Sequence, residues 1–430
     1  MADHSLRCRL RNAGFHQGKV FYQIFPDRFC EGVENKPMPF PDRIYQADKH
    51  AEPFWQPNEV GGHLNEDYFG GDLKGIQLKL PYLHEMGIDF IYLNPIFEAH
   101  SNHRYNTADY LNVDPLLGTN EDFETLCAEA KRYGIGIVLD GVFSHTGSDS
   151  RYFNREGRYG EGGVIDTWLR RGAAGFRLDV ADELPDEFIE KIRTAVKRVG
   201  PEKFLLGEVW EDATTKYGFN QRRTYLLGKG LDSVMNYPFK NAVLDFVKGK
   251  PAEQAANEIL TLCEHYPAPA MDTALNFLST HDTERALTVI ADEPANGRGR
   301  QWQSGRCVTG DAYEEGLLRL RMAYAIIYTL PGVPCLYYGD EIAMQGYRDP
   351  FNRAFFRWDA HEQRLRPVLA QLAQLRHTCE AFRTGKLWVL RAEGGILHYQ
   401  RIGEVETAEI IVNRTEHIIV ETLASGKSTE

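Results

Sequence analysis

The sequence predicts a (β/α)8 TIM barrel followed by a small C-terminal antiparallel β module. Eight short apolar stretches alternate with helical patterns, which is typical of parallel βαβ units. Eight such units within 430 residues, 43% of them hydrophobic, favour a barrel with its chemistry at the carboxyl ends of the strands. After Gly385 the pattern changes to strands separated by turns. Alternation alone also allows a doubly wound open sheet, which is the structural alternative.

The eight expected strands are short, apolar and bounded by turn or charged residues. They are residues 20–25, 90–93, 135–139, 175–179, 204–209, 233–235, 274–279 and 333–337. Helical apolar spacing predicts helices between them, two of which stop at Gly87 and Gly134, because glycine commonly follows the last helical residue. The expected helices are residues 73–86, 121–133, 165–170, 187–199, 317–329 and 362–378.

This pattern divides the chain into three regions. Residues 1–19 form an N-terminal extension, residues 20–384 the barrel and residues 385–430 the C-terminal module. The strands expected in that module are residues 387–391, 396–401, 408–412 and 417–420.

Composition and charge indicate which kinds of binding partner and which cellular compartment to expect. The net charge of −12 argues against nucleic acid or an anionic membrane surface. The seven cysteines are scattered and lack C-x-x-C spacing, so we expect free thiols in a reducing compartment. The first residues contain no apolar signal-peptide core, and no stretch is long and apolar enough to span a bilayer. We therefore expect a cytoplasmic protein whose oligomeric state stays open.

The stretch Gly175-Phe-Arg-Leu-Asp-Val-Ala-Asp-Glu183 ends a buried strand in charged residues. Because side chains alternate along a strand, Arg177 and Asp179 share one face. A guanidinium favours the ionised form of a neighbouring carboxylate, so we expect Asp179 to stay charged at neutral pH and to suit a nucleophile. A structural Arg–Asp ion pair is the alternative interpretation.

Polar side chains also follow three other expected strands. Because the carboxyl ends of parallel strands meet at one end of a barrel, we expect these side chains to converge. A single His or Asp at a strand end is usually a cap or a loop anchor, whereas a set at several strand ends favours a functional site. The set comprises Asp140, His145, Arg177, Asp179, Glu208, Trp210, His281 and Asp282.

Two carboxylates in opposite protonation states are the apparatus of glycoside hydrolysis. Asp179 beside Arg177 is the expected nucleophile. Glu208 follows an apolar run and precedes Val209 and Trp210, so partial desolvation is expected to raise its pKa, as a general acid requires. A metal hydrolase is not favoured, because no H-x-x-x-H pattern or carboxylate cluster has ligand spacing.

Four stretches resemble the motifs of the α-amylase family of glycoside hydrolases, and within it the neopullulanase/cyclomaltodextrinase group. The likeness extends from about Val20 to Trp358, and the stretches occur in the family's order. They are Asp140-Gly-Val-Phe-Ser-His145, Gly175-Phe-Arg-Leu-Asp-Val-Ala-Asp-Glu183, Gly207-Glu-Val-Trp210 and Phe277-Leu-Ser-Thr-His-Asp282.

The resemblance implies a role for each residue. Asp179 would be the nucleophile of a retaining double displacement, Glu208 the acid/base and Asp282 the third carboxylate, which holds sugar hydroxyls. Arg177 would orient Asp179, and Asp140 would orient rather than react. The implied substrate-binding residues are His145 and His281 in the cleaved subsite, Tyr105 beneath it, Asp349 and Arg353 at the next sugar, and Trp210, on the leaving-group side or packed in the core.

The chain departs from the family pattern in ways that affect the cleft. Asn106 stands where the group usually has Asp, and Asp182 stands where it usually has Asn, a position linked to the choice between α-1,4 and α-1,6 bonds. Because the first barrel strand is expected to begin at Val20, we expect no N-terminal β module of the kind typical of the group. Residues 144–163 leave room for only a shortened version of the lobe that normally walls the cleft, and Gly162-Gly163-Val164 marks an abrupt join.

Residues 27–35 and 69–72 resemble a calcium loop and its partner segment. Carboxylates and carbonyls are the ligands that Ca²⁺ prefers. Val33 stands where that loop has an Asp, and Ser144 stands where the family often has an Asn tied to calcium. We expect no required cofactor. The candidate calcium ligands are Asn35, Gly70 and Asp72.

The sequence thus predicts a retaining α-glucan hydrolase that cleaves α-1,4 bonds of maltooligosaccharides, cyclodextrins or pullulan. Cleavage of some α-1,6 bonds is a further expected activity, and transglycosylation is another outcome of the same covalent intermediate, set by how well water is excluded. An exo-acting α-glucosidase or oligo-1,6-glucosidase is the alternative with the same chemistry. A catalytically silent barrel used for binding is the alternative from a different class. The sequence leaves chain-length preference, bond preference and natural substrate open.

Overall fold

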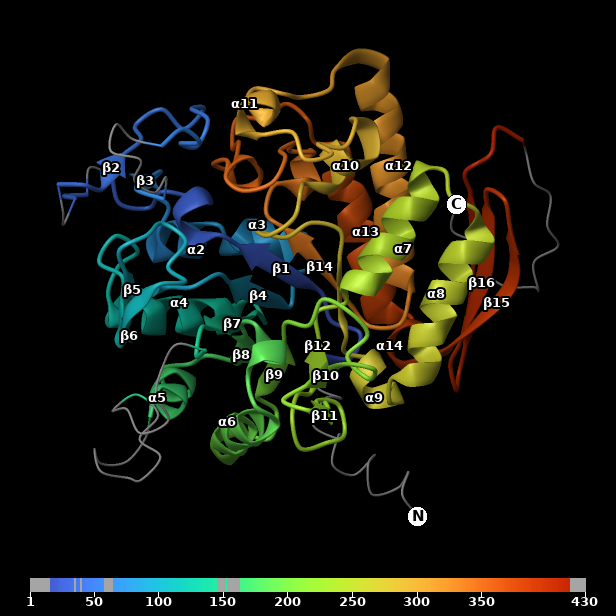
Figure 1. Cartoon of the computed structure of the whole chain (residues 1–430), viewed down its shortest axis with the longest axis horizontal. Coiled ribbons are helices and arrows are strands. Elements are labelled where there is room, and N and C mark those ends of the chain that lie inside the picture. The colour runs from blue at the N-terminus through green and yellow to red at the C-terminus, as the bar shows by residue number, and fades with distance from the viewer. Residues whose placement is uncertain are drawn as a thin grey trace.

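The computed structural model describes residues 16–34, 36–38, 41–57, 65–144, 152 and 163–417. Eight parallel strands occupy the centre of the molecule and helices surround them (Figure 1). The strands are β1 (Phe21–Ile24), β4 (Phe90–Leu93), β7 (Gly136–Gly141), β8 (Gly175–Leu178), β9 (Phe204–Gly207), β12 (Ser233–Val234), β13 (Leu275–Phe277) and β14 (Val333–Tyr337).

The sheet closes on itself. Its neighbours follow the order β12-β9-β8-β7-β4-β1-β14-β13. A parallel bridge pairs Met235 with Leu275, and the amide of Asn236 donates to the Leu275 carbonyl at 2.9 Å. The two edge strands therefore meet, so the TIM-barrel prediction is confirmed and the open sheet is excluded.

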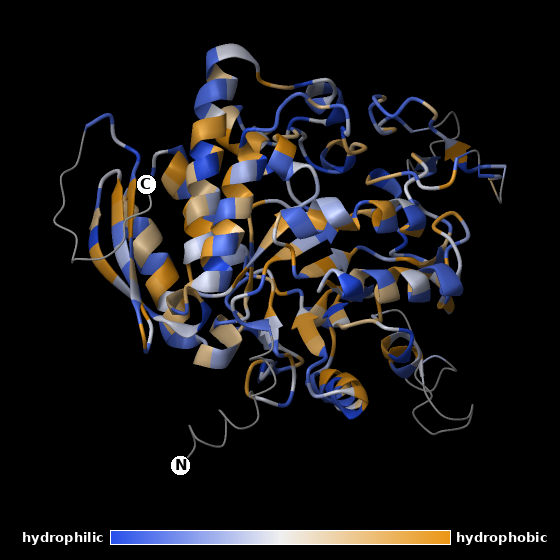
Figure 2. Ribbon diagram, turned by 180° about the vertical axis from the view of Figure 1, so that it is seen from behind, coloured by the Kyte–Doolittle hydropathy of each residue, from blue (hydrophilic) through white to orange (hydrophobic). Residues whose placement is uncertain are grey.

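Alternation along the strands produces two layers of core. Phe21, Val138 and Leu206 belong to the smaller buried cluster, which fills the barrel. Their strand neighbours Tyr22 and Leu205 belong to the larger cluster between strands and helices. Figure 2 shows largely hydrophobic strands surrounded by helices that carry both hydrophobic and hydrophilic residues. The strands therefore carry apolar residues on both faces, as expected for a buried parallel sheet.

Most helices lie between the barrel strands in sequence and cover them on the outside (Figure 1). Those before β13 are α2 (Leu73–Leu78), α3 (Leu80–Glu85), α4 (Asn120–Arg132), α5 (Val164–Arg170), α6 (Asp186–Val199), α7 (Tyr237–Lys248), α8 (Ala252–His265) and α9 (Ala268–Met271). Those after it are α10 (Ala286–Ala291), α11 (Arg300–Gln303), α12 (Gly310–Thr329), α13 (Leu365–Thr378) and α14 (Ala381–Thr384).

The single helix expected over residues 73–86 is wrong. The structure has two short helices, α2 and α3, which meet at Lys79. Pro81 lies in the first turn of α3, where its missing N–H and fixed φ are tolerated, but it cannot continue a helix from the preceding turn. Asp72 caps the other end of this segment by accepting from the Gly75 amide at 2.5 Å.

A three-stranded antiparallel sheet follows the barrel, as the sequence predicts. It consists of β15 (Lys386–Glu393), β16 (Ile396–Ile402) and β17 (Thr407–Asn413), and β15 packs against α8. The fourth strand expected there, residues 417–420, lies almost entirely outside the described residues, as do residues 1–15 and most of the shortened interval 144–163.

Short strands and 3-10 turns lie in the loops that connect the barrel strands and helices. The small two-stranded sheets are β2 (Ile44–Tyr45) with β3 (Asp67–Tyr68), β5 (Phe97–Ala99) with β6 (Thr107–Val113), and β10 (Tyr217–Gly218) with β11 (Gln221–Arg222). The 3-10 turns are η2 (Pro26–Arg28), η3 (Ala181–Glu183), η4 (Asp340–Ile342) and η5 (Phe351–Arg353). Within the described part of the chain, no helix combines the length and apolarity needed to cross a membrane.

Candidate active site

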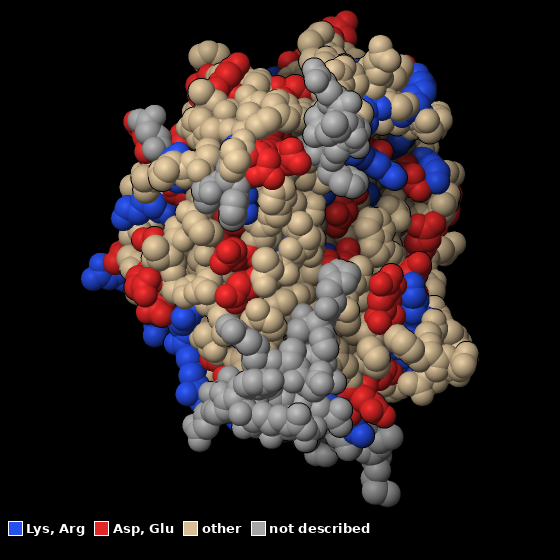
Figure 3. Space-filling model, turned by 60° about the vertical axis from the view of Figure 1, so that its left-hand side comes forward, with Lys and Arg blue, Asp and Glu red and all other residues tan. Residues whose placement is uncertain are grey.

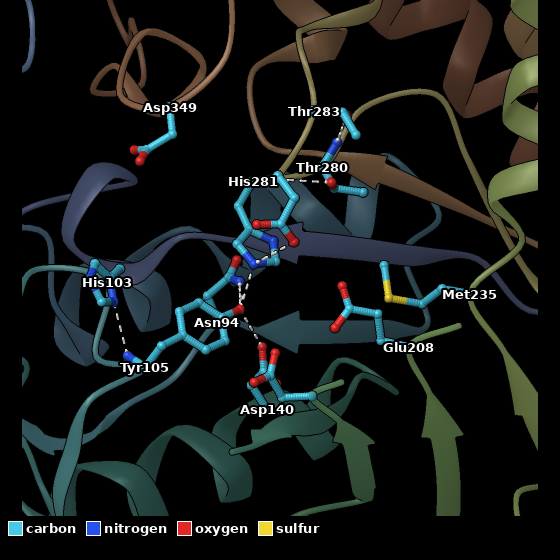
Figure 4. Close-up of polar contacts among 12 residues, drawn as sticks. Asn94, His103, Tyr105, Asp140, Glu208, Met235, Thr280, His281, Thr283 and Asp349 are labelled. Carbon is cyan, nitrogen blue, oxygen red and sulfur yellow. Dashed lines mark hydrogen bonds and ion pairs between the residues drawn. The ribbon is translucent and has the colours of Figure 1, made fainter. Parts of the chain in front are cut away.

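The polar strand ends converge at the carboxyl end of the barrel. Asp140 lies near the end of β7 and is paired in register with Arg177 on β8. Asp179 follows β8 and Glu208 follows β9 directly, and these two strands are neighbours. In Figure 4, hydrogen bonds link Asn94, Asp140 and His281 to Tyr105, and Glu208 lies apart from this group on the other side of the site. Side chains from different βα units thus face one small space, as the sequence predicts.

Arg177 is the hub of the site. Its side chain is fully buried, and its Nη1 donates to Asp140 Oδ1 and to Asp179 Oδ1, both at 2.9 Å. Its Nη2 lies 3.0 Å from Glu208 Oε2, and its Nε contacts the Met235 sulfur at 3.4 Å. One cation therefore serves three carboxylates, which fixes their relative positions through a rigid planar group.

The protonation of Asp179 differs from the sequence-based expectation. Burial raises the pKa of Asp179 from its usual 3.8 to about 7; Arg177 opposes this shift, and the charges of Asp140 and Glu208 reinforce it. The expectation that Arg177 keeps Asp179 ionised at neutral pH is wrong, because burial outweighs the attraction of the guanidinium. The nucleophile candidate therefore titrates near neutrality.

Glu208 is buried, as the apolar run before it predicts, and is surrounded by donors. The Val180 amide donates to its Oε2 at 2.9 Å, and Trp210 Nε1 donates to its Oε1 at 3.2 Å. The Tyr237 hydroxyl lies 3.5 Å from the same Oε1. Val180 adopts a left-handed conformation with φ of 40°, which a β-branched residue rarely adopts. This strained residue aims its amide from the segment after Asp179 at Glu208.

A hydrogen-bond network sets the tautomer of His281. The amide nitrogen of Gln23 donates to Asn94 Oδ1 and to His281 Nδ1, both at 2.9 Å. Nδ1 is therefore an acceptor and Nε2 carries the proton, which points to Tyr105 Oη at 2.5 Å and Asp282 Oδ2 at 3.1 Å. Burial lowers the pKa of His281 well below its usual range, so the imidazole is neutral.

Asp282 lies at the rim of the site, on the segment that follows β13. Besides His281 it faces Arg353, whose Nη2 is 3.8 Å from Asp282 Oδ1. Arg353 Nη1 also pairs with Asp349 Oδ1 at 3.0 Å, and its Nε donates to the His281 carbonyl at 3.0 Å. Burial raises the pKa of Asp282. The Asp349–Arg353 pair thus adjoins the site, rather than being a detached surface ion pair.

Two aromatic side chains mark opposite parts of the site. Tyr105 donates to Asp140 Oδ2 at 2.8 Å, and its ring stacks on His281 with an interplanar angle of 7° (Figure 4). Trp210 stacks on Tyr237 at 4.0 Å between ring centroids and remains 43% exposed. Trp210 is therefore no packed core residue; it offers an open aromatic face beside Glu208.

Some sequence-based candidates lie elsewhere or outside the described residues. His145 is one of the latter. Asn106 accepts a hydrogen bond from the Ser101 hydroxyl at 2.5 Å, so it supports the loop between β5 and β6. Asp182 pairs with Lys216 at 3.0 Å, on the segment just after Asp179.

Sequence reasoning missed several residues that contact the site residues from other segments. Two carry a signal in the sequence: Gln23 is a polar residue inside the apolar stretch 20–25, and Asn94 directly follows an expected strand. Tyr92 donates to Asp140 Oδ2 at 2.6 Å from inside an apolar strand, where an aromatic residue reads as core. The missed residues are Gln23, Tyr92, Asn94, His103, Met235 and Tyr237.

The face shown in Figure 3 carries acidic side chains, some of them recessed in a hollow between uncharged residues. A buried nucleophilic carboxylate, a second carboxylate among donors and a third at the rim can together attack a carbon centre, protonate its leaving oxygen and hold hydroxyl groups. This set is suited to splitting an acetal in a polyhydroxylated substrate.

Comparisons with known proteins agree with this chemistry. The family model described as alpha amylase, catalytic domain, matches residues 23–162 and 159–396. The cyclomaltodextrinase of Geobacillus thermopakistaniensis is 32% identical over 449 aligned residues, which cover 92% of this chain and 68% of that protein. The cyclic α-maltosyl-(1→6)-maltose hydrolase of Arthrobacter globiformis, solved in complex with cyclic α-maltosyl-(1→6)-maltose, has a TM-score of 0.75 and 28% identity, covering 93% of this chain and 91% of that one.

The amylopullulanase of Thermoanaerobacter thermohydrosulfuricus is 31% identical and covers 90% of this chain. The chain spans only 24% to 36% of the length of the three amylopullulanases it matches. Its alignment to the first extends over 487 positions, more than the 430 residues of the chain, so the alignment contains gaps in this chain. The family model matches in two segments that overlap at residues 159–162, inside the interval 144–163.

Proposed function

The chain belongs to the α-amylase family of glycoside hydrolases, and on that premise we propose that it hydrolyses α-1,4-glucosidic bonds of maltooligosaccharides, cyclodextrins or pullulan with retention of configuration. The relatives named above include a cyclomaltodextrinase and an amylopullulanase, whose names concern such glucans. These likenesses support the substrate class, and the geometry supports the mechanism.

One observation carries the proposal. The two amino nitrogens of a single guanidinium, that of Arg177, contact one oxygen each of Asp179 and Glu208, at 2.9 and 3.0 Å. Two carboxylates held on one guanidinium are close neighbours. Retaining glycosidases need such proximity, with carboxyl groups about 5–5.5 Å apart, because no water has to fit between the nucleophile and the sugar.

In the first step Asp179 attacks the anomeric carbon and forms a glycosyl ester. The bond from that carbon to the glycosidic oxygen breaks, and Glu208 gives its proton to the leaving oxygen. In the second step Glu208 takes a proton from water, the resulting hydroxide oxygen attacks the same carbon, and Asp179 leaves. Two inversions at one carbon return the α configuration.

The surrounding groups act on the sugar rather than on the bond. Neutral His281 donates from Nε2 and does not add positive charge where an oxocarbenium-like centre develops. Asp282 at the rim accepts from sugar hydroxyls, and the exposed face of Trp210 stacks on the sugar that leaves. The Asp349–Arg353 pair provides a donor and an acceptor for the neighbouring sugar.

The titration of Asp179 predicts the acidic limb of the rate profile. Only the ionised carboxylate attacks, and its pKa is raised to about 7. We therefore expect kcat/KM for maltoheptaose to fall about tenfold per pH unit below about pH 7 and to level off above it. Initial rates at low substrate concentration from about pH 5 to about pH 9 measure this profile.

A matched variant separates the nucleophile from buried carboxylates in general. Asp272 precedes β13 at the opposite end of the barrel, and burial raises its pKa to about 7 as well. Asp272→Asn should keep the acidic limb unchanged if Asp179 produces it. A limb that disappears in Asp272→Asn, or a flat wild-type profile down to about pH 5, would contradict the assignment.

Product analysis tests the proposed function itself. Maltoheptaose, β-cyclodextrin and pullulan are incubated separately with the protein and the products are separated by chromatography. We expect early maltose from β-cyclodextrin or panose from pullulan, because an endo-acting cleft accepts a chain with no free end near the cut.

Other product patterns identify the alternatives. Glucose released only from linear chains would replace the proposal by an exo-acting α-glucosidase. No product from any glucan, with a folded protein, would favour a silent barrel used for binding. Longer products than the substrate would show transglycosylation, in which a sugar hydroxyl replaces water in the second step.

A further inference from the structure

The ammonium of Lys36 lies between the loop that follows β1 and the start of α2, where three oxygens surround it. We call these oxygens, from Gly70, Asp72 and Leu116, the cage. Its Nζ donates to the Gly70 carbonyl at 2.7 Å and to the Leu116 carbonyl at 3.1 Å. The same atom pairs with Asp72 Oδ2 at 2.6 Å. The Lys36 side chain is only 11% exposed and that of Asp72 only 2%. Three oxygens from two segments, residues 70–72 and Leu116, thus contact one buried cation.

Asp72 has no capacity left for a further cation. Besides Lys36, its carboxylate accepts from the Gly32 amide at 3.1 Å, the Val33 amide at 3.0 Å and the Gly75 amide at 2.5 Å. Val33 stands where a calcium loop has an acidic residue, and here it presents its amide, a donor, to Asp72. Compared with the calcium loop that it resembles, this loop has no anionic side chain at position 33, and the cation of Lys36 lies close by.

A second lysine, Lys49, binds the carbonyl of Phe69, the residue before Gly70, in the same way. Lys49 Nζ donates to the Phe69 carbonyl at 2.6 Å and pairs with Glu31 Oε2 at 2.9 Å. Glu31 also accepts from the Tyr45 hydroxyl at 2.6 Å. Consecutive carbonyls, those of Phe69 and Gly70, are therefore each bound by a lysine.

We propose that the Lys36 ammonium is a built-in substitute for a structural metal ion, so that this loop folds without calcium. Gly70 and Asp72, two of the candidate calcium ligands, already bind Lys36, and Asn35, the third, lies outside the described residues. Ca²⁺ needs six to eight oxygens at about 2.3–2.6 Å, and an ammonium on the same oxygens excludes it by position and by charge. The residues present do not fit a bound calcium ion.

The first experiment compares the melting temperature of the wild-type protein in a chelator and in calcium. We expect the same Tm with about 5 mM EDTA and with about 10 mM CaCl2, because no metal ligand is lost or gained. A Tm that falls in EDTA and is restored by calcium would overturn the proposal.

The second experiment removes the charge but keeps the length of the side chain. Lys36→Met leaves the Asp72 carboxylate and two carbonyls without their cation, so we expect Tm to fall by about 2–4 °C. The matched control is Lys74→Met on α2, because Lys74 is exposed and its ammonium donates to the Gln77 side chain of the same helix at 3.1 Å. Equal Tm values for the two variants would overturn the proposal.

The third experiment opens the cage. Lys36→Ala leaves the three oxygens and an empty space, so we expect about 10 mM CaCl2 to raise the Tm of this variant by about 2–4 °C while the wild type does not respond. If calcium leaves the Tm of Lys36→Ala unchanged, the three oxygens are no cation site and the proposal is wrong. All three readouts are independent of catalytic activity.

Discussion

Asp179→Asn is expected to lower kcat on maltoheptaose by about 10⁴-fold or more, the order of loss seen when the nucleophile of a covalent mechanism is removed. An amide oxygen is too weak a nucleophile to form the glycosyl ester, while its shape still fits beside Arg177, which lies 2.9 Å from Asp179 Oδ1. The measurement is the initial rate of reducing-end release at saturating substrate.

The same variant should remain folded, and its stability checks the titration. Burial raises the pKa of Asp179 from 3.8 to about 7, so above pH 7 the charged carboxylate is less favourable in the folded protein than in the unfolded chain. That penalty fades as the pH falls from about 7 to about 4, and below that pH both states are protonated. At about pH 8, Asp179→Asn should therefore melt at or above the wild-type temperature.

Two results would refute the nucleophile assignment. One is a folded Asp179→Asn that keeps more than about 1% of the wild-type kcat. The other is a similar loss in Asp272→Asn, whose carboxylate is buried with a pKa of about 7 at the far end of the barrel. The control should keep full activity, because Asp272 touches no group of the site.

Glu208→Gln is expected to lower kcat on maltoheptaose by about 10²–10⁴-fold, the usual contribution of general acid catalysis. The glucosyl leaving group needs a proton, and Gln has none to give. An aryl maltoside with a nitrophenolate leaving group needs no proton, so formation of the ester should be much less affected. The measurement is the ratio of the two rates in the variant, relative to the wild type.

The contacts of Glu208 make this comparison interpretable. Gln keeps an oxygen for Trp210 Nε1 or for the Val180 amide, and it loses the ion pair with Arg177. An equal loss on both substrates would argue that another group is the acid. A small loss on both would indicate that Glu208 only positions Arg177.

The barrel strands follow from local pattern. Two of them, β4 (Phe90–Leu93) and β14 (Val333–Tyr337), have the bounds that the sequence predicts, and the other six differ only at their ends. Apolar runs bounded by turn residues determine strands because burial on both faces leaves little choice of residue. The split between α2 and α3 at Lys79 also has a local signal, Pro81, which apolar spacing obscured.

The β5–β6 hairpin shows where local pattern is insufficient. The segment after β4 is mostly polar, so it predicts a loop, yet Phe97 pairs with Val113 and both are buried. The hairpin packs through Tyr110, whose ring lies 5.9 Å from that of Phe97 and 5.1 Å from that of Tyr152. Burial against other segments, not propensity, makes these residues strands.

The sequence by itself determined which carboxylates stand at the ends of which strands, because side-chain alternation and strand order are local properties. Only the tertiary structure decided how the charges are shared. Arg177 contacts three carboxylates, burial raises the pKa of Asp179 to about 7 against the opposing charge of Arg177, and Lys36 binds the oxygens that resemble calcium ligands. These partners come from segments far apart in the chain, so only closure of the barrel and docking of its loops bring them within hydrogen-bond distance.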